Sequence, residues 1–542
     1  MFRLIDLFGY LSIFFRAGTL VFQSVLLGGV FFLLWIARPT PHIPEGSIPI
    51  VRSSSSRWFR ASAIGLAVVQ AFSLYTSSTV LMITAEIGFW DVIGANFFVA
   101  GSCILIAAIV TFFVAGMEEK IRSFVLPLLA AIILSGSVMT SHAAARVSGR
   151  PPLIALTFLH EAATGFWIGG LSFLILALLR AKDRPTQWYL ISRFSRMAVA
   201  SVGVLLASGL AMSLSYVGSF DAIYGTAYGV MVAGKAVMLG ALLVLGGINF
   251  LLLRNSTPDA AVPKIRRLVE AELGIGITAI LMAASLTSQP PAVDLANNTV
   301  TSQMVLARIT PAWPRLSYPA ATPVSVNGKP LYNAARRFTT LRDIDGGFLS
   351  YKTLADIQES EANHHWMGLI VLAMGVLALL AKTGKAKWAE SWPLLLVGIS
   401  IFIFLRADTE SWPFGTQGFW AVWLHPEVFQ HRLAAVVCAG FAIFELRARK
   451  RGLDDNPLAL VFPLMCALGG AVLLTHSHSI TNVKEELLAE LSHVPLGILA
   501  VLAGWSRWVE IRLPAASRRV PSWIWPACFV LIAAGLLNYR EM

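Results

Sequence analysis

The sequence is poor in charged residues. Asp, Glu, Lys and Arg make up only 13% of the 542 residues, whereas a soluble protein carries about a quarter. Hydrophobic residues make up 56%, and the mean hydropathy is +0.70. Apolar runs recur along nearly the whole chain, and each is long enough to cross about 30 Å of hydrocarbon. The composition excludes a soluble globular protein and predicts an all-α polytopic integral membrane protein.

Several chemical signatures are also missing. The four cysteines are all single and lie inside apolar segments, with no CxxC pair. Because there is no CxxCH, a covalent c-type haem is not expected, and because there is no Walker-type loop, neither is a bound nucleotide. No cleavable signal peptide is apparent, since the first apolar stretch, 10–36, is long enough to span and ends at Arg38 without a small-residue cleavage site.

The net charge of +12 comes from Lys and Arg dispersed among short loops, where they orient helices rather than bind nucleic acid. About fourteen spans are expected. They are 10–36, 58–84, 90–116, 122–142, 153–179, 191–215, 228–253, 267–288, 365–381, 391–406, 427–446, 457–475, 487–505 and 521–538. The basic residues fall in alternate loops, whereas 85–89, 216–227 and 407–426 contain none. The positive-inside rule therefore predicts that both termini face outward.

One long extramembrane stretch divides the spans. It covers 289–363 and is rich in Pro, Asn, Ser and Thr. A stretch of this length between packed helices usually indicates a small added subdomain or a functional cap. We therefore predict three parts: a domain of eight spans at 1–288, an outward-facing loop or cap at 289–363, and a histidine-rich domain of six spans at 364–542.

Nine of the ten histidines lie at or near the outward ends of the predicted spans, and only His42 lies in an inward loop. The nine are His142, His160, His364, His365, His425, His431, His476, His478 and His493. Imidazole is costly to hold in hydrocarbon and is the commonest transition-metal ligand. This one-sided distribution favours metal capture at the outer face.

In the first half, His142 closes the fourth span and His160 lies one or two turns inside the fifth. Antiparallel spans could bring the two imidazoles together at equal depth, with Met139 one helical turn below His142. Two imidazoles and a thioether suit copper, particularly Cu(I), better than hard cations. The alternative is that both histidines are interfacial and bond to backbone carbonyls. The Gly169-Gly170 pair removes side-chain bulk, so a neighbouring helix can approach closely.

Two further ionisable groups lie inside the predicted spans of this half. Glu161 follows His160 directly, and Lys235 lies in the seventh span. Ionisable residues inside a membrane usually have a partner. A Lys235–Glu161 pair or a gating role for Lys235 is more plausible than metal ligation.

The second half contains the denser cluster. Its candidate ligands are Glu361, His364, His365, His425, His431, His476, His478, Glu490 and His493. Glu361–His364 and Glu490–His493 are spaced i,i+3, and so share a helix face. Ferritin-like di-metal proteins build their sites from such Glu-x-x-His pairs. The set predicts a second metal site, although for any single histidine a capping or interfacial role is equally plausible.

Five sequence motifs carry a family resemblance. They are SHAAA at 141–145, LHEAATGFWIGGL at 159–171, RFSR at 193–196, YVGS at 216–219 and GTAYG at 225–229, followed by Lys235. Over roughly 130–290 they resemble the CopD copper-resistance family. The resemblance implies a bacterial inner-membrane protein involved in copper uptake or tolerance. The His-rich second half is similar to the extended forms of that family.

We therefore expect a copper-binding membrane protein that captures copper ion at the periplasmic face and passes it inward or to a partner, such as a periplasmic copper chaperone. It is more plausibly a transporter or metal-binding protein than an enzyme. No ladder of Met or His crosses the spans, so binding is better supported than translocation. The alternatives are a membrane metalloenzyme or electron-transfer protein with a haem or di-metal centre, and a scaffold whose histidines only satisfy backbone groups.

These assignments predict two independent metal sites. Replacing His142 and His160 together should abolish one of them, and replacing His476, His478 and His493 should abolish the other. Copper stoichiometry of each purified variant measures this. An unchanged copper content in both variants contradicts the assignment.

Overall fold

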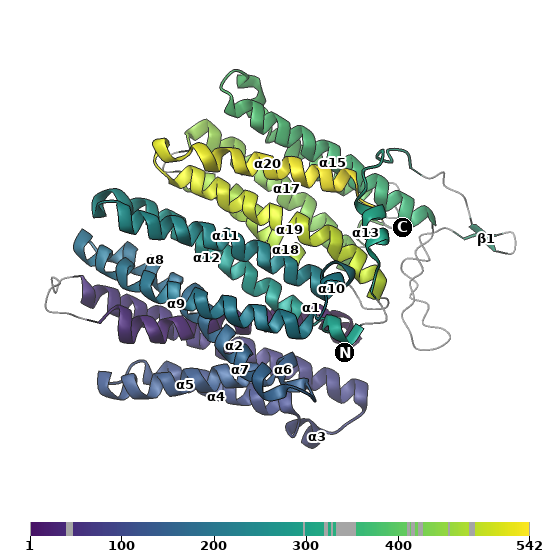
Figure 1. The fold of residues 1–542 in the computed structure, drawn as a ribbon. Helices are drawn as coiled ribbons and strands as arrows, with labels where there is room; N and C mark the ends of the chain where they lie inside the picture. Colours follow the sequence, from purple (N-terminus) through teal and green to yellow (C-terminus); the bar gives the residue numbers. More distant parts are fainter. Residues whose placement is uncertain are drawn as a thin grey trace. The chain divides into compact units, whose positions relative to one another are not determined.

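The structure is a computed structural model that describes residues 2–38, 47–295, 299–318, 324–326, 329–331, 354–408, 412–413, 418–420, 426–453, 456–475 and 483–540. Within these residues thirteen helices are long and apolar enough to cross a membrane. The protein is therefore an all-α polytopic membrane protein, as the composition predicts (Figure 1). The expected span at 427–446 lies in α17 (Pro426–Arg451), which is not one of the thirteen.

The chain forms two compact units. The first comprises Met1–Thr299 with Ala471–Ser479, and the second comprises Val300–Gly470 with Ile480–Met542. The three-part division expected from the sequence remains a prediction.

The first unit is a bundle of long helices joined by short ones. In order they are α1 (Phe2–Phe31) with the π-helical turn η1 (Phe32–Ile36), α2 (Ile48–Ala85), α3 (Phe89–Ile93), α4 (Asn96–Val114), α5 (Glu119–Met139), α6 (His142–Ala145), α7 (Arg150–Thr164), the π-helical turn η2 (Gly165–Gly169), α8 (Gly170–Arg180), α9 (Arg184–Tyr216), α10 (Phe220–Gly225), α11 (Ala227–Asn255), α12 (Pro258–Leu286) and the 3-10 turn η3 (Ala292–Leu295). Helices α7, η2 and α8 together make one span. The end of this unit at which α5 gives way to α6 is called here the His142 end.

Three spans form the centre of the first unit. The most apolar stretch of α1 is 72% buried, that of α12 is 67% buried and that of α7–α8 is 61% buried, against 17% for α9 and 11% for α11. Polar side chains on α1, α7 and α12 that point into the bundle therefore face protein rather than lipid. This is the position in which ionisable groups are tolerated in a membrane protein.

Glycines allow α1 to touch the π-helical turn η2 backbone to backbone. A Cβ atom on Gly28 would lie 2.2 Å from the Gly170 nitrogen, and one on Gly169 would lie 1.8 Å from the Ser24 oxygen. No larger residue fits at either position without moving a helix. The close approach predicted for the Gly169-Gly170 pair is confirmed, and its partner is α1.

The second unit begins with α13 (Ser302–Ile309) and a small antiparallel hairpin of β1 (Val324–Val326) and β2 (Lys329–Leu331), in which Ser325 pairs with Pro330. Longer helices follow. They are α15 (Leu354–Lys382), the 3-10 turn η4 (Lys387–Ser391), α16 (Leu394–Arg406), α17, the 3-10 turn η6 (Pro457–Leu460), α18 (Val461–Leu474), α19 (Val483–Arg512), the 3-10 turn η7 (Ala515–Ser517) and α20 (Arg519–Leu537).

A buried ion network joins four helices of the second unit. Arg507 on α19 binds Glu510 at 2.7 Å and Glu445 of α17 at 3.4 Å, and its side chain is 1% exposed. Lys382, at the end of α15, also binds Glu510, and the Trp525 indole of α20 donates to the same carboxylate at 2.7 Å. Because the carboxylates of Glu445 and Glu510 lie against the cations of Arg507 and Lys382, their charges offset one another and the network can stay buried, which links these helices.

The backbone contact between α1 and η2 predicts a strong substitution effect. Gly169→Ala should lower the free energy of unfolding by about 1–3 kcal/mol, because the added methyl group overlaps a carbonyl oxygen. Thermal unfolding of the detergent-purified protein measures this. Gly240→Ala on α11 is the matched control, since nothing lies within 4 Å of its added Cβ. Equal transition temperatures for the two variants would contradict the close contact.

Candidate functional site

The corner between α10 and α11 is built by the GTAYG motif. Thr226 is 1% exposed; its hydroxyl accepts from the Gly229 N–H at 3.0 Å and donates to the Ala222 carbonyl at 2.7 Å. A Cβ atom on Gly229 would lie 2.0 Å from the same carbonyl oxygen. Threonine and glycine are thus required to start α11 here, and this start positions Tyr228 at the His142 end.

His142 lies in an aromatic pocket at that end. Its ring centroid is 6.4 Å from those of Tyr216, at the end of α9, and of Tyr228, at the start of α11. Its Nε2 atom is buried and has no hydrogen-bond partner. Burial lowers the pKa of His142 from its usual value, and a hydrogen bond with the Leu286 backbone opposes this effect. The imidazole is therefore neutral at neutral pH, which is the form that binds metals.

The pocket is closed by a second layer of contacts. The Arg146 guanidinium lies 5.7 Å from the centre of the Tyr216 ring and binds Asp294 of η3 at 3.1 Å. Met139, the last residue of α5, is half-buried. It precedes His142 by only three residues, so its thioether is a candidate second ligand on the same segment.

A polar cluster lies deeper in the first unit. Gln23 of α1 donates to the Glu161 carboxylate of α7 at 2.7 Å, and Arg16 and Lys235 both interact electrostatically with Glu161. Lys235 and Glu161 therefore interact electrostatically, and a direct ion pair between them stays a prediction. His160 makes a 3.2 Å hydrogen bond with the Ser208 hydroxyl of α9. Arg16 and Gln23 did not emerge from the sequence as candidates, although both are polar residues inside the first apolar span.

The structure separates His142 from His160 along the membrane-crossing direction. Along α9, His160 bonds to Ser208, whereas His142 packs on Tyr216. These two α9 residues are eight positions apart, which corresponds to about 12 Å along the helix axis. On α11, His142 packs on Tyr228 and His160 interacts with Lys235, a difference of about 10 Å. The expectation of equal depth is therefore wrong. His142 belongs to the separate helix α6 beyond the α5 span, while His160 lies well inside α7.

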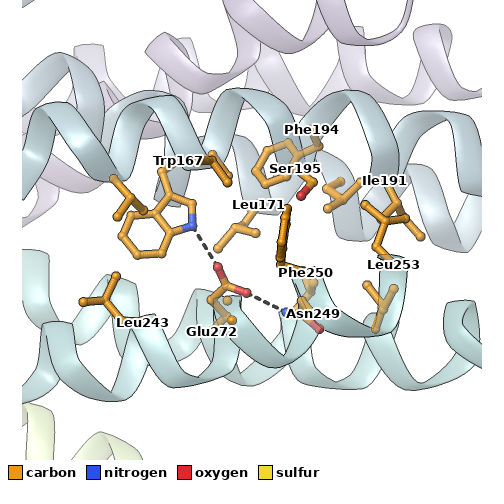
Figure 2. Close-up of a pocket in the computed structure, with 18 residues that line it drawn as sticks. Trp167, Leu171, Ile191, Phe194, Ser195, Leu243, Asn249, Phe250, Leu253 and Glu272 are labelled. Atoms are coloured by element: carbon orange, nitrogen blue, oxygen red, sulfur yellow. Dashed lines mark hydrogen bonds between the residues drawn. The ribbon is translucent and has the colours of Figure 1, made fainter. Parts of the chain in front are cut away.

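A further polar group, which did not emerge from the sequence as a candidate, surrounds Glu272 on α12. The Trp167 indole of η2 donates to its Oε1 at 2.8 Å, and Asn249 of α11 donates to its Oε2 at 2.8 Å (Figure 2). These residues line a cavity of about 260 Å³ together with apolar side chains of α8, α9 and α11. The signal for this group in the sequence is an acidic residue inside an apolar run.

In the second unit His365 is bound on both sides by backbone. It is 4% exposed; its Nδ1 accepts from the Arg315 N–H at 2.7 Å, and its Nε2 lies 2.9 Å from the Tyr539 carbonyl. The neighbouring His364 stacks on the Tyr539 ring at 3.8 Å and contacts the Ser360 carbonyl at 2.8 Å. Glu361 binds Arg315 at 3.3 Å. In this arrangement, His365 links α15 to two other segments.

The remaining candidates of the second half of the chain are spread over several segments. His431 of α17 bonds to Asp408 at 3.0 Å. Glu490 and His493 lie on α19, and Glu490 is buried. His425, His476 and His478 lie outside the described residues. No group of three or more His, Cys, Asp or Glu that could hold a metal occurs in the part of the chain that the structure describes. The second metal site remains a prediction.

Part of the sequence resembles known proteins. Residues 189–286 match the family described as Copper resistance protein D. Over 161 residues the chain is 36% identical to the copper transport protein CutJ of Bacillus subtilis (strain 168), and the aligned part covers 29% of this chain and 29% of that relative. No solved structure matches.

The matched region runs from α9 to the end of α12. It includes the RFSR motif, the GTAYG corner, Lys235, Asn249 and Glu272, whereas His142 and His160 precede it. The resemblance predicted from the motifs is confirmed here. Through residues 189–286 this membrane-spanning chain is similar to the CopD copper-resistance family.

Proposed function

We propose that the protein binds copper at the His142 end of its first unit and serves copper uptake, homeostasis or resistance. The observation that carries the proposal is the buried, unpartnered Nε2 atom of His142. A buried polar atom without a partner costs free energy, so its retention favours a ligand that the pocket is built to receive. The family description and the name of the relative both refer to copper.

The donor set around His142 suits copper. A neutral imidazole and the Met139 thioether are soft donors of the kind that Cu(I) prefers over the oxygen ligands of Mg²⁺ or Ca²⁺. The two tyrosine rings and the Arg146–Asp294 pair surround the imidazole and limit its movement. A fixed imidazole needs little reorganisation when the metal binds.

The cluster below this pocket supplies polar groups for a path farther into the bundle. Arg16 interacts electrostatically with both His142 and Glu161, so the outer His142 pocket and the deeper Glu161 cluster are electrostatically coupled. The Oε1 atom of Gln23, whose amide nitrogen donates to Glu161 in this deeper cluster, is buried without a partner. We infer that copper passes from His142 towards His160, and that Glu161 and Lys235 adjust the charge of this second level.

The orientation follows from the basic loops. The positive-inside rule supports a His142 end that faces outward, which for a CopD-type protein is the periplasm of a bacterial inner membrane. Capture from that side, with a periplasmic chaperone as donor or acceptor, is then the simplest role. We propose that the second half of the chain contributes a further copper site, formed by the histidines of α17 and α19 together with His425, His476 and His478.

Elemental analysis of the purified protein, with an optical spectrum, tests the cargo. Copper without a haem band is expected. Iron or a Soret band would contradict the proposal and favour an oxidoreductase.

His142→Gln and His160→Gln should have different effects. We expect His142→Gln to remove copper binding at the His142 end and so lower the copper content. His160→Gln should leave this binding intact and slow the movement of copper farther into the bundle. Copper titration in detergent and copper uptake by vesicles separate the two. Equal loss of binding in both variants would indicate one shared site and contradict the two-level arrangement.

Copper binding at His142 should also resist acid. Because burial lowers the pKa of this imidazole below the ordinary 6.5, protons displace copper only below that pH, whereas an exposed histidine begins to lose its metal near pH 6.5. A pH titration of copper retention in the wild-type protein and in His142→Gln measures this, because the copper that the variant lacks is the copper held at His142. Half-loss above pH 6.5 would contradict it.

His365→Ala provides a contrast in the second unit. It should lower the free energy of unfolding by about 1–3 kcal/mol, because the Arg315 N–H and the Tyr539 carbonyl lose their partner. It should leave copper binding at the His142 end unchanged. Thermal unfolding and copper content together distinguish the structural role of His365 from a ligand role. If His365 were a copper ligand, the variant would lose copper while the metal-free protein kept its stability.

A further inference from the structure

Glu272 is an acidic group held in the middle of a membrane-spanning helix without a cationic partner. It is 3% exposed. The groups that act on its carboxylate are Trp167 and Asn249, both neutral donors. Two neutral hydrogen bonds orient a carboxylate but do not cancel its charge, and an uncompensated charge in a membrane interior is costly. The site therefore favours binding of a positive species.

The groups that act on the Glu272 carboxylate include no charged side chain of the described surrounding elements. Helix α12 packs against α1, α8, α9, α11 and η2. Arg16 of α1 and Lys235 of α11 interact with Glu161, and Arg193 of α9 donates to Tyr189. Arg184 of α9 pairs with Asp259 of α12, Arg267 pairs with Glu270 on α12, and Arg266 interacts with these groups. Lys264 lies eight residues before Glu272, about 12 Å away along α12, and Arg180, Arg196 and Arg254 are exposed. Of the eighteen residues that line the cavity, Glu272 is the one acidic or basic side chain.

The cavity itself indicates which positive species fits. Apart from the Trp167 indole, its polar groups are Glu272, Asn249 and Ser195, and the other lining residues are apolar (Figure 2). Calcium and magnesium take six or more oxygen ligands, and copper prefers nitrogen and sulfur. These few oxygens satisfy neither class. A proton needs one oxygen on which to sit and one acceptor for its hydrogen bond.

Asn249 can supply that acceptor. In the structure its Nδ2 donates to the Oε2 atom of Glu272, and its own Oδ1 is buried without a partner. A carboxamide presents a donor on one side and an acceptor on the other. Turning the amide by half a rotation would place Oδ1 opposite a protonated Oε2. The Trp167 N–H can only donate, so it keeps Oε1 as the acceptor in both states.

We propose that Glu272 is a proton-binding site in the core of the first unit, and that Asn249 is a two-way partner for it. With Glu272 ionised, the amide donates to Oε2. On protonation, Oε2–H donates to the rotated amide oxygen. The site is separate from the proposed copper site and does not depend on it.

Infrared difference spectroscopy of the full-length, copper-free protein in nanodiscs tests the proposal. We expect a carbonyl stretching band of a protonated carboxylic acid that appears on acidification and disappears at alkaline pH. Glu272→Gln should lose this band and remain folded, because glutamine can accept from Trp167 and donate to Asn249 as the protonated acid does. Glu270→Gln is the matched control and should retain the band, since that carboxylate pairs with Arg267.

Asn249→Leu tests the partner. It should keep a titrating band but shift its frequency, because the acid O–H then lacks its acceptor. Other carboxyl groups, Glu161 among them, give bands that are common to both proteins, so the Glu272 band is the one that remains in the wild-type-minus-Glu272→Gln difference spectrum. Absence of such a difference band in the folded proteins would overturn the proposal. A band of unchanged frequency in Asn249→Leu would overturn the role of the amide.

Discussion

The backbone contact between α1 and the π-helical turn η2 determines the rest of the first unit. Gly28, Gly169 and Gly170 let the two backbones meet without intervening side chains. Helix α1 carries Gln23, and the helix that continues through η2 carries Glu161, so the 2.7 Å bond between these two side chains depends on the same approach. A wider spacing would leave a carboxylate inside the membrane without its donor, which is far more costly than the same loss in water.

The π-helical turn also explains why one helix serves two polar levels. A single π turn inserted into an α-helix shifts the direction of the side chains that follow it, and such turns are frequent at functional sites. Before η2, Glu161 faces α1 and interacts with Lys235. Within η2, Trp167 faces α12 and donates to Glu272. The irregularity thus allows the central helix to serve the Glu161 cluster and the Glu272 cavity at different depths.

The histidines differ in their hydrogen bonding, and this difference separates candidate ligands from structural residues. His365 has both ring nitrogens bound to backbone groups, so metal binding there would first break two buried hydrogen bonds. His142 has a buried nitrogen with no partner, and nothing has to be broken. Both occupy the ends of apolar segments in the sequence, and residue type and position alone do not distinguish them. Our proposals for copper and for the proton both rest on polar atoms that the fold leaves without a partner.

The sequence by itself determined that the chain crosses a membrane many times, because the length and spacing of apolar runs depend only on local composition. It also carries the resemblance to the CopD family, because the RFSR and GTAYG motifs and Lys235 are contiguous signals, and Thr226 and Gly229 act through local backbone geometry. Only the tertiary structure decided that His142 and His160 lie at different depths, since that depends on where α6 leaves the α5 span and on which turn of α9 each ring meets. It alone assembled Trp167, Asn249 and Glu272, which are far apart in the chain and are brought together by the packing of η2, α11 and α12.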